Sequence, residues 1–294
     1  MYITNNIYSN YYNANRIKTE NNSVQFGSNP DSTKLLFHNN DFFIKIKGYG
    51  KNREWAREVK ALTDKAAQMM RKGCSADESL ISIAEDMKSA NSHCSDKFKV
   101  NHTGIIRARR KGYGSTGIWE GQDLTSYYDS MVKSNYSKSY STYKDRFDAV
   151  MKKPIKNPYD DICLTRIDKR IMGSCIVHGK ASCINDALDR VGGIYFNLNR
   201  KYIQKPENVT AENLEDINSG VAEIRWIMAH ATPWERGSDS ISNSFMRALY
   251  KSMGIKTYPS KEGVSFDLEA YCTELADYKK NFSGYFEKPP EIID

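Results

Sequence analysis

The chain has 294 residues, a net charge of +7 and 39% hydrophobic residues. This length is enough for one large domain, or two modest lobes, with a sizeable core. No apolar run approaches the roughly 20 residues of a membrane span, and the mild positive charge suits an anionic ligand or an acidic partner without requiring nucleic acid.

Residues 1–35 are rich in Asn, Ser and Tyr and poor in Leu and Val, so they bury too little apolar surface to fold alone. We expect a disordered tail there, followed by a single domain of two lobes over residues 36–294. The tail lacks the apolar region of an ordinary signal peptide. Its polar bias is typical of an export signal of a bacterial injection system, and equally of a plain disordered tail. Tyr2 stands where myristoylation needs a glycine, so no myristoyl anchor is expected.

Apolar residues at alternating three- and four-residue steps predict helices along most of the chain. Predicted helices cover residues 52–72, 77–92, 143–151, 181–199, 214–232 and 238–253, and a last helix follows residue 265. Residues 35–47 form either a short strand or a buried entry segment. The expected fold class is therefore mainly α, with few strands.

The pattern of residues 224–255 predicts a helix, a tight loop and a second helix. Pro233 ends the first helix, because proline disfavours the helical conformation of the residue before it. Arg236, Gly237 and Ser238 then lead into the second helix, whose free backbone N–H groups favour an anion. One interpretation is a binding site for the phosphates of a nucleotide. The other is a helical corner whose arginine braces a carbonyl or a carboxylate.

Two further groups could handle protons. His178 precedes the helix that begins near residue 181, where it could either cap and pack or take part in chemistry. Asp267 falls in the first turn of the last predicted helix, for which Ser265 is the predicted N-cap. With Arg170 and Arg236 as cations for phosphates, these residues could make one cluster.

The six cysteines include no Cys-x-x-Cys pair, and we expect them to be reduced thiols. Cys175, His178 and Cys183 lie close in sequence, but a fourth zinc ligand at a matching spacing is missing. Cys183 and His178 could also be the nucleophile and base of a cysteine protease. Such pairs normally come from distant segments, which disfavours this interpretation.

Three stretches together resemble the AvrB family of avirulence effectors, which are injected by type III secretion. The first is R-W-I-M-A-H-A-T-P-W-E-R-G-S, at residues 225–238, and the second is V-S-F-D-L-E-A, at residues 264–270. The third is Arg170 followed by H-G-K-A-S-C-I, at residues 178–184. The resemblance implies the Fido fold, a bilobal and mostly helical fold with a few short strands.

The resemblance also implies a function in the host cell cytosol. The family binds a nucleotide in its cleft and a host immune regulator as an extended peptide, and a member is understood to transfer a deoxyhexose (rhamnose) from a nucleotide sugar to a threonine. The donor would be a UDP- or dTDP-deoxyhexose, and an ADP-like nucleotide would also fit. No tightly bound cofactor, metal or nucleic acid is expected. The implied nucleotide-binding residues are Arg170, Arg236, Gly237 and Ser238. The implied catalytic residues are Asp267 and His178.

Two rival functions remain open. Nucleotidyl (AMP) transfer of the Fic type uses a histidine that opens the motif H-P-F-x-x-G-N-G-R. Here His230 is followed by Ala-Thr-Pro-Trp, and Asp239 and Ser240 replace the asparagine and glycine of that motif. We therefore expect His230 to pack inside the first helix. The second rival is an adaptor without enzymatic activity that binds a host kinase or regulator.

Overall fold

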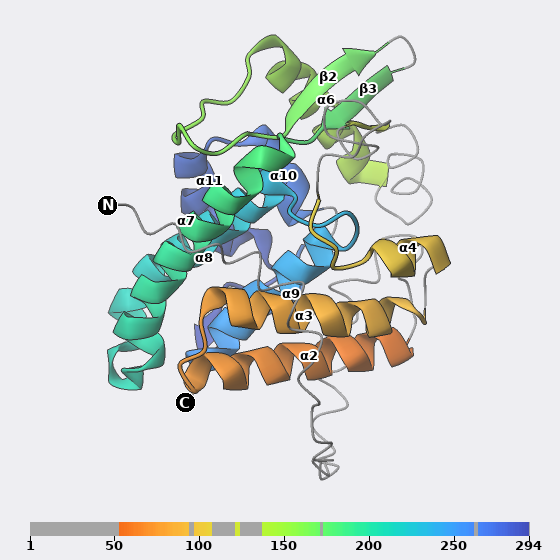
Figure 1. Cartoon of the computed structure of the whole chain (residues 1–294). Coiled ribbons are helices and arrows are strands. Elements are labelled where there is room, and N and C mark those ends of the chain that lie inside the picture. Colours follow the sequence, from red (N-terminus) through yellow and green to blue (C-terminus); the bar gives the residue numbers. More distant parts are fainter. Residues whose placement is uncertain are drawn as a thin grey trace, which may run out of the picture.

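The computed structural model describes residues 53–93, 97–107, 121–123, 137–170, 173–261 and 264–293, and Figure 1 shows their arrangement. The predicted tail over residues 1–35 and the segment at 35–47 lie outside them. Helices make up most of the described chain, joined by a three-stranded and a two-stranded sheet, which confirms the mainly α class. Among the described residues, no helix is both long and apolar enough to cross a membrane.

Two helices form the centre of the molecule: α8 (Leu214–Ala231) and α9 (Ser238–Ser252). Helix α8 packs against α7, α9, α10 and α11. In its second half, from Val221 to Ala231, only Glu223 is not fully buried. Both helices begin and end close to the predicted positions. Thr232, directly after α8, and Gly254, two residues after α9, adopt the left-handed conformation.

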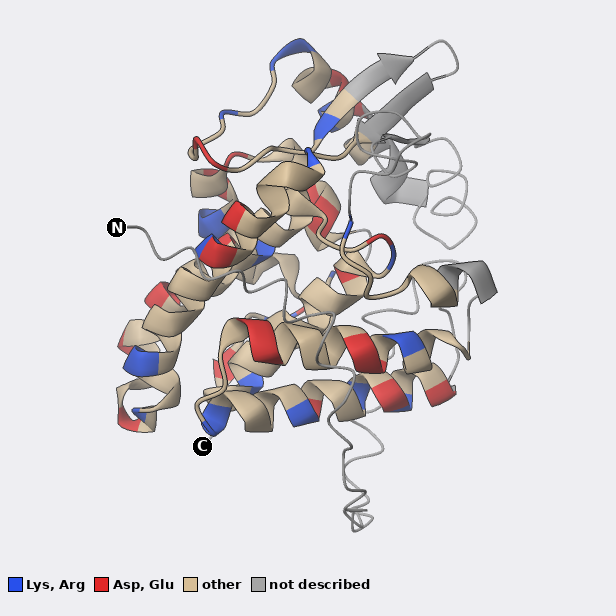
Figure 2. Cartoon of the chain, in the orientation of Figure 1, with Lys and Arg blue, Asp and Glu red and all other residues tan. Residues whose placement is uncertain are grey.

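Helices α2 (Arg53–Arg71) and α3 (Ala76–Asn91) lie side by side and both contact α9 (Figure 1). Their apolar sides enter the core, while acidic and basic residues are interspersed along their visible sides (Figure 2). Helix α3 starts with a capping box, in which the Ser75 hydroxyl accepts from the Glu78 N–H and the Glu78 carboxylate accepts from the Ser75 N–H. The predicted pair of helices is confirmed.

Replacing Ser75 with alanine should lower the free energy of unfolding by about 1 kcal/mol, because the Glu78 N–H loses its acceptor. Ser75→Gly is the matched variant and should cost only a few tenths of a kcal/mol, since glycine at an N-cap leaves the first N–H groups open to water. Urea unfolding of the three proteins checks this. Equal stability of Ser75→Ala and the wild type would contradict it.

A small antiparallel sheet lies beside the helical centre, in the strand order β1–β3–β2. Strand β2 (Arg166–Arg170) pairs with β3 (Gly173–Val177), with Arg166 opposite Val177, and β1 (Gly121–Asp123) adds to the far edge of β3. This hairpin was not predicted. Strand β3 ends at Val177, so the hairpin positions the next residue, His178.

The other elements connect these parts. They are α4 (Lys97–His102), α6 (Ser137–Lys152), η3 (Ala181–Cys183), α7 (Ile184–Leu198), η4 (Asn199–Ile203), η5 (Pro206–Asn208), η6 (Ala211–Asn213), β4 (Ile255–Lys256), α10 (Phe266–Cys272), α11 (Leu275–Asn281), η7 (Phe282–Tyr285) and β5 (Glu291–Ile292).

The single last helix predicted after residue 265 is wrong, because the chain divides into α10 and α11 at Thr273. Thr273 is extended, its carbonyl accepts from Trp226 Nε1 at 3.0 Å, and its hydroxyl accepts from Arg146 Nη2 at 3.0 Å. Arg146 also forms a two-bonded ion pair with Glu269, at 2.8 Å for each bond. These tertiary bonds interrupt a pattern that is helical in sequence.

Candidate functional site

A cavity of about 150 Å³ lies where the α8–α9 loop meets the start of α10. Five of the six predicted site residues line it: His178, Arg236, Gly237, Ser238 and Asp267. The sixth, Arg170, is the last residue of β2, and its side chain lies outside the described residues, so its place in a nucleotide site stays a prediction.

The α8–α9 loop is held in place by Arg107, from a segment more than a hundred residues earlier. Its guanidinium donates to the carbonyls of Ala231 (2.9 Å), Thr232 (2.8 Å) and Gly179 (2.8 Å). The Ala231 and Thr232 carbonyls lie at the C-terminal end of α8. A cation is favourable there because this end carries the negative end of the helix dipole. Arg107 thus braces this helical corner, and the two interpretations of Arg236 stay predictions.

Gly237 allows the loop to enter α9. Its φ of 84° lies in the left-handed region, and a Cβ there would meet the Thr103 side chain at 3.3 Å. The Ser238 hydroxyl closes the same turn, accepting from the Trp234 N–H and donating to the Trp234 carbonyl, both at 2.9 Å. Gly237 and Ser238 therefore shape the start of α9 at the cavity wall.

His178 is held as a neutral imidazole in one tautomer. Burial, followed by the positive charges of Arg107 and Arg236, lowers the pKa of His178 to about 3. The Thr232 hydroxyl lies 3.1 Å from His178 Nδ1 and donates its own proton to the Ala229 carbonyl. It therefore accepts from Nδ1–H, which leaves Nε2 as the unprotonated nitrogen. Thr232 reaches this position with a φ of 42°, a conformation that threonine seldom adopts and that costs about 1–3 kcal/mol.

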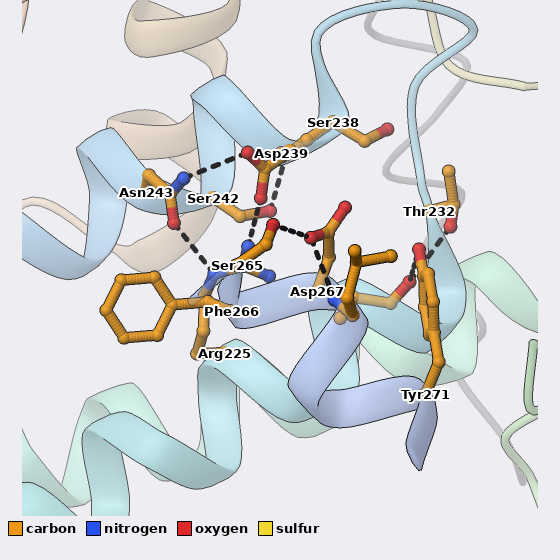
Figure 3. A network of polar contacts seen from close by, with 12 residues as sticks. Arg225, Thr232, Ser238, Asp239, Ser242, Asn243, Ser265, Phe266, Asp267 and Tyr271 are labelled. Atoms are coloured by element: carbon orange, nitrogen blue, oxygen red, sulfur yellow. Dashed lines mark hydrogen bonds and ion pairs between the residues drawn. The ribbon is translucent and has the colours of Figure 1, made fainter. Parts of the chain in front are cut away.

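An ion pair between a buried arginine and a half-buried aspartate lines the other wall of the cavity (Figure 3). The side chain of Arg225 is 1% exposed, donates to Asn243 Oδ1 at 2.9 Å and forms an ion pair with Asp239. Asn243 Nδ2 also donates to Asp239 Oδ2 at 3.0 Å. Desolvation, and then the nearby negative charge of Asp267, raise the pKa of Asp239 above its usual value, while Arg225 acts to lower it.

Asp267 is fixed through one of its two carboxylate oxygens. Oδ1 accepts from the Ser265 hydroxyl at 2.5 Å and from the Leu268 N–H at 2.8 Å. The second oxygen points into the space in front of Tyr271 and Thr232 (Figure 3). Ser265 is the N-cap residue, as predicted, but its hydroxyl bonds to Asp267 and not to the backbone.

Charges of both signs line the cavity. Arg236 lies close enough to His178 to lower its pKa, and Asp267 lies close enough to Asp239 to raise its pKa. The Glu235 carboxylate, which also lines the cavity, pairs with His102. Arg225 and Asp239 are already paired with one another. Such a cavity suits a ligand that has both an anionic group and hydroxyl groups.

The sequence did not identify Arg107, Arg225, Asp239, Thr232 or Tyr271 as parts of this site. Arg225 and Asp239 are charged residues in two helices that each have an apolar face. Because charged residues are seldom buried without a partner, their position was a signal that the sequence contained. Arg107 lies 125 residues before Thr232, so no local pattern connects them.

His230 is packed inside α8, as predicted, and is not among the residues that line the cavity. Its ring lies 4.2 Å from the Trp226 ring and 5.6 Å from the Tyr271 ring, and Nε2 donates to the Ala270 carbonyl at 3.1 Å. Burial lowers the pKa of His230 to about 3. A neutral, enclosed histidine is poorly placed to accept a phosphoryl group or to act as a base.

Acid should therefore destabilise the protein through His230. His230 binds a proton more weakly in the folded state than in the unfolded state. The stability that depends on a neutral His230 is therefore fully present above the unfolded pKa of about 6.5, and it is lost as the pH falls toward the folded pKa of about 3. At pH 4.5 the loss is roughly 3 kcal/mol. His230→Gln, whose Nε2 can still donate to the Ala270 carbonyl, should show a stability loss between pH 7 and pH 4.5 that is smaller by about this amount. Urea unfolding at both pH values measures it, and parallel losses in the two proteins would contradict it.

The cysteines differ from the prediction. Cys163 and Cys183 form a disulfide with a Cα–Cα distance of 5.8 Å, so the expectation of reduced thiols is wrong for this pair. Cys183 is consequently not a free nucleophile beside His178. No group of three or more His, Cys, Asp or Glu residues that could hold a metal ion occurs in the described part of the chain.

In a comparison with known protein families, residues 147–289 match a family model described as avirulence protein, AvrB_AvrC. All the lining residues of the cavity fall within this range. No curated protein matches the chain.

Proposed function

We propose that this protein, whose residues 147–289 belong to the AvrB/AvrC family of avirulence proteins that act in the host, transfers a deoxyhexose from a nucleotide sugar to a threonine of a host immune regulator. The family match bears out the predicted resemblance over the segments that carried it. Delivery into host cells agrees with the family, and the type III route is part of the proposal.

Arg236 before the N-terminus of α9 and Asp267 at the start of α10, both lining one cavity, support this proposal. A nucleotide sugar has phosphates at one end of the sugar and hydroxyl groups around its ring. Arg236 and the N-terminus of α9 suit the phosphate nearest the sugar, and Asp267 suits the sugar. The volume of about 150 Å³ is smaller than the roughly 300–1,000 Å³ of a typical ligand pocket, so the nucleoside would lie across the rim.

In the proposed reaction the bond between the anomeric carbon and the phosphate oxygen breaks, and its electron pair leaves with the nucleoside diphosphate. Arg236 stabilises the charge that develops on this leaving group. The threonine oxygen forms the new bond to the anomeric carbon, and its proton passes to the second oxygen of Asp267. His178 Nε2, unprotonated and fixed by Thr232, accepts a hydrogen bond from a hydroxyl group and orients it.

The test is intact mass spectrometry of candidate host regulator peptides after incubation with the protein and a panel of UDP- and dTDP-deoxyhexoses, or with ATP. A deoxyhexose increment on a threonine is the expected result. An adenylate increment would replace the proposal with nucleotidyl transfer. Peptide binding without any increment would replace it with the adaptor function, in which a host kinase or regulator is bound but not modified.

Arg236→Ala should abolish binding of the nucleotide sugar in isothermal titration calorimetry, because the phosphate loses its charged donor. Arg190→Ala is the matched control, since Arg190 pairs with Asp161 on the surface and does not line the cavity. Its affinity should equal that of the wild type. Unchanged affinity in a folded Arg236→Ala protein would contradict the assignment of Arg236.

A further inference from the structure

A second and larger cavity, of about 620 Å³, lies between the end of α7, η4 and α8, with Lys279 of α11 at its border. It shares no lining residue with the cavity at the α8–α9 loop. We refer to it as the η4 groove. Its floor passes over Gly220 of α8, where a Cβ would meet the Leu198 side chain at 3.0 Å, so a larger residue would crowd the floor.

Both carboxylates in the η4 groove are already neutralised. Asp216 accepts from Lys201 Nζ at 2.7 Å and from the Tyr202 hydroxyl at 2.5 Å. Glu223 accepts from Lys279 Nζ at 2.6 Å and from the Tyr159 hydroxyl at 2.7 Å. Two lysines of the groove are thus used to balance its two acids.

Two further cations of the groove, Arg200 and Lys205, have no carboxylate within ion-pair distance among the described residues. Both are exposed. The Arg200 guanidinium lies 5.9 Å from the ring centre of Phe196, which is 62% exposed. The groove therefore has an excess of two positive charges, and Phe196 lies beside Arg200 without lining the groove.

The backbone at this place is also unusual. Residues Asn199–Ile203 form a π-helical turn directly after α7, and this turn carries Arg200. Such turns are rare, and they occur frequently at functional sites. Here the turn places Arg200 and Lys201 at the groove, with Lys205 soon after them.

We propose that the η4 groove binds an acidic peptide segment of a partner protein. Carboxylates of the peptide pair with Arg200 and Lys205, and an apolar side chain packs on Ile194 and Leu198, which line the groove. The excess of positive charge favours an acidic segment over a neutral or basic one. A cavity of this volume suits a peptide better than a single ion. The inference does not depend on the proposed transfer reaction.

The test starts with a random peptide display library selected on the full-length protein, with counter-selection on the Arg200→Glu/Lys205→Glu variant. The expected result is enrichment of peptides that place Asp or Glu beside an apolar residue. The most enriched peptide is then synthesised with a fluorescent label, and its affinity is measured by anisotropy. No enrichment of acidic residues over the starting library would overturn the proposal.

The matched control is Arg57→Glu/Lys88→Glu, which makes the same change of charge on α2 and α3. The groove variant should weaken binding at least tenfold and the control less than twofold. All affinities should fall as salt is raised. An equal loss in the two charge variants would show general attraction to a basic protein and would overturn the proposal. Circular dichroism confirms that each variant is folded.

Discussion

Replacing Arg225 with alanine is expected to lower the free energy of unfolding by about 3–5 kcal/mol, because the half-buried Asp239 loses its ion-pair partner and Asp267 loses a nearby positive charge. Arg225 is 1% exposed and contacts both Asp239 and Asn243. Its removal also leaves a space among packed side chains. Chemical unfolding at neutral pH measures the loss.

The control for Arg225 is an arginine of the same chain in an exposed ion pair. Arg190 pairs with Asp161, with side chains that are 37% and 43% exposed, so Arg190→Ala should cost less than about 1 kcal/mol. The double variant Arg225→Met/Asp239→Asn should recover part of the loss, because it removes both charges of the pair. A loss in Arg225→Ala no larger than that in Arg190→Ala would contradict a balanced pair with a buried arginine.

Asp267→Asn is expected to slow the proposed transfer by about 10²–10⁴-fold, because the amide keeps the shape of the carboxylate but cannot take the proton of the threonine. Its oxygen can still accept from Ser265 and Leu268, so the fold should be retained. Single-turnover rates with a saturating donor separate this effect from binding of the nucleotide sugar.

Asp277→Asn serves as the control for Asp267, since Asp277 also lies in the first turn of a helix but is exposed and distant from the cavity lining. Its transfer rate should equal that of the wild type. If Asp267→Asn retained the full rate, the proton acceptor would have to be sought elsewhere, with His178 the next residue to replace.

Local signals in the sequence were sufficient for the main helices. The apolar periodicity of α2, α3, α8 and α9 was readable because a helix that packs on one face repeats every 3.6 residues. Pro233 and Gly254 marked helix ends through backbone restrictions that act within one or two residues. For the same reason the sequence placed Arg236, Gly237 and Ser238 before a helix, and Asp267 in a first turn.

The partners of these residues were decided by the tertiary structure. Arg107 holds the Thr232 carbonyl across 125 residues, and Trp226 holds the Thr273 carbonyl and helps to divide the predicted last helix. Hydrogen bonds and ion pairs depend on distances of a few ångströms, and periodicity carries no information about which distant segments come that close. The chain by itself thus determined which residues stand at the ends of helices. Only the folded protein determined that five of the six predicted site residues meet in one cavity and that Arg225 and Asp239 balance each other there.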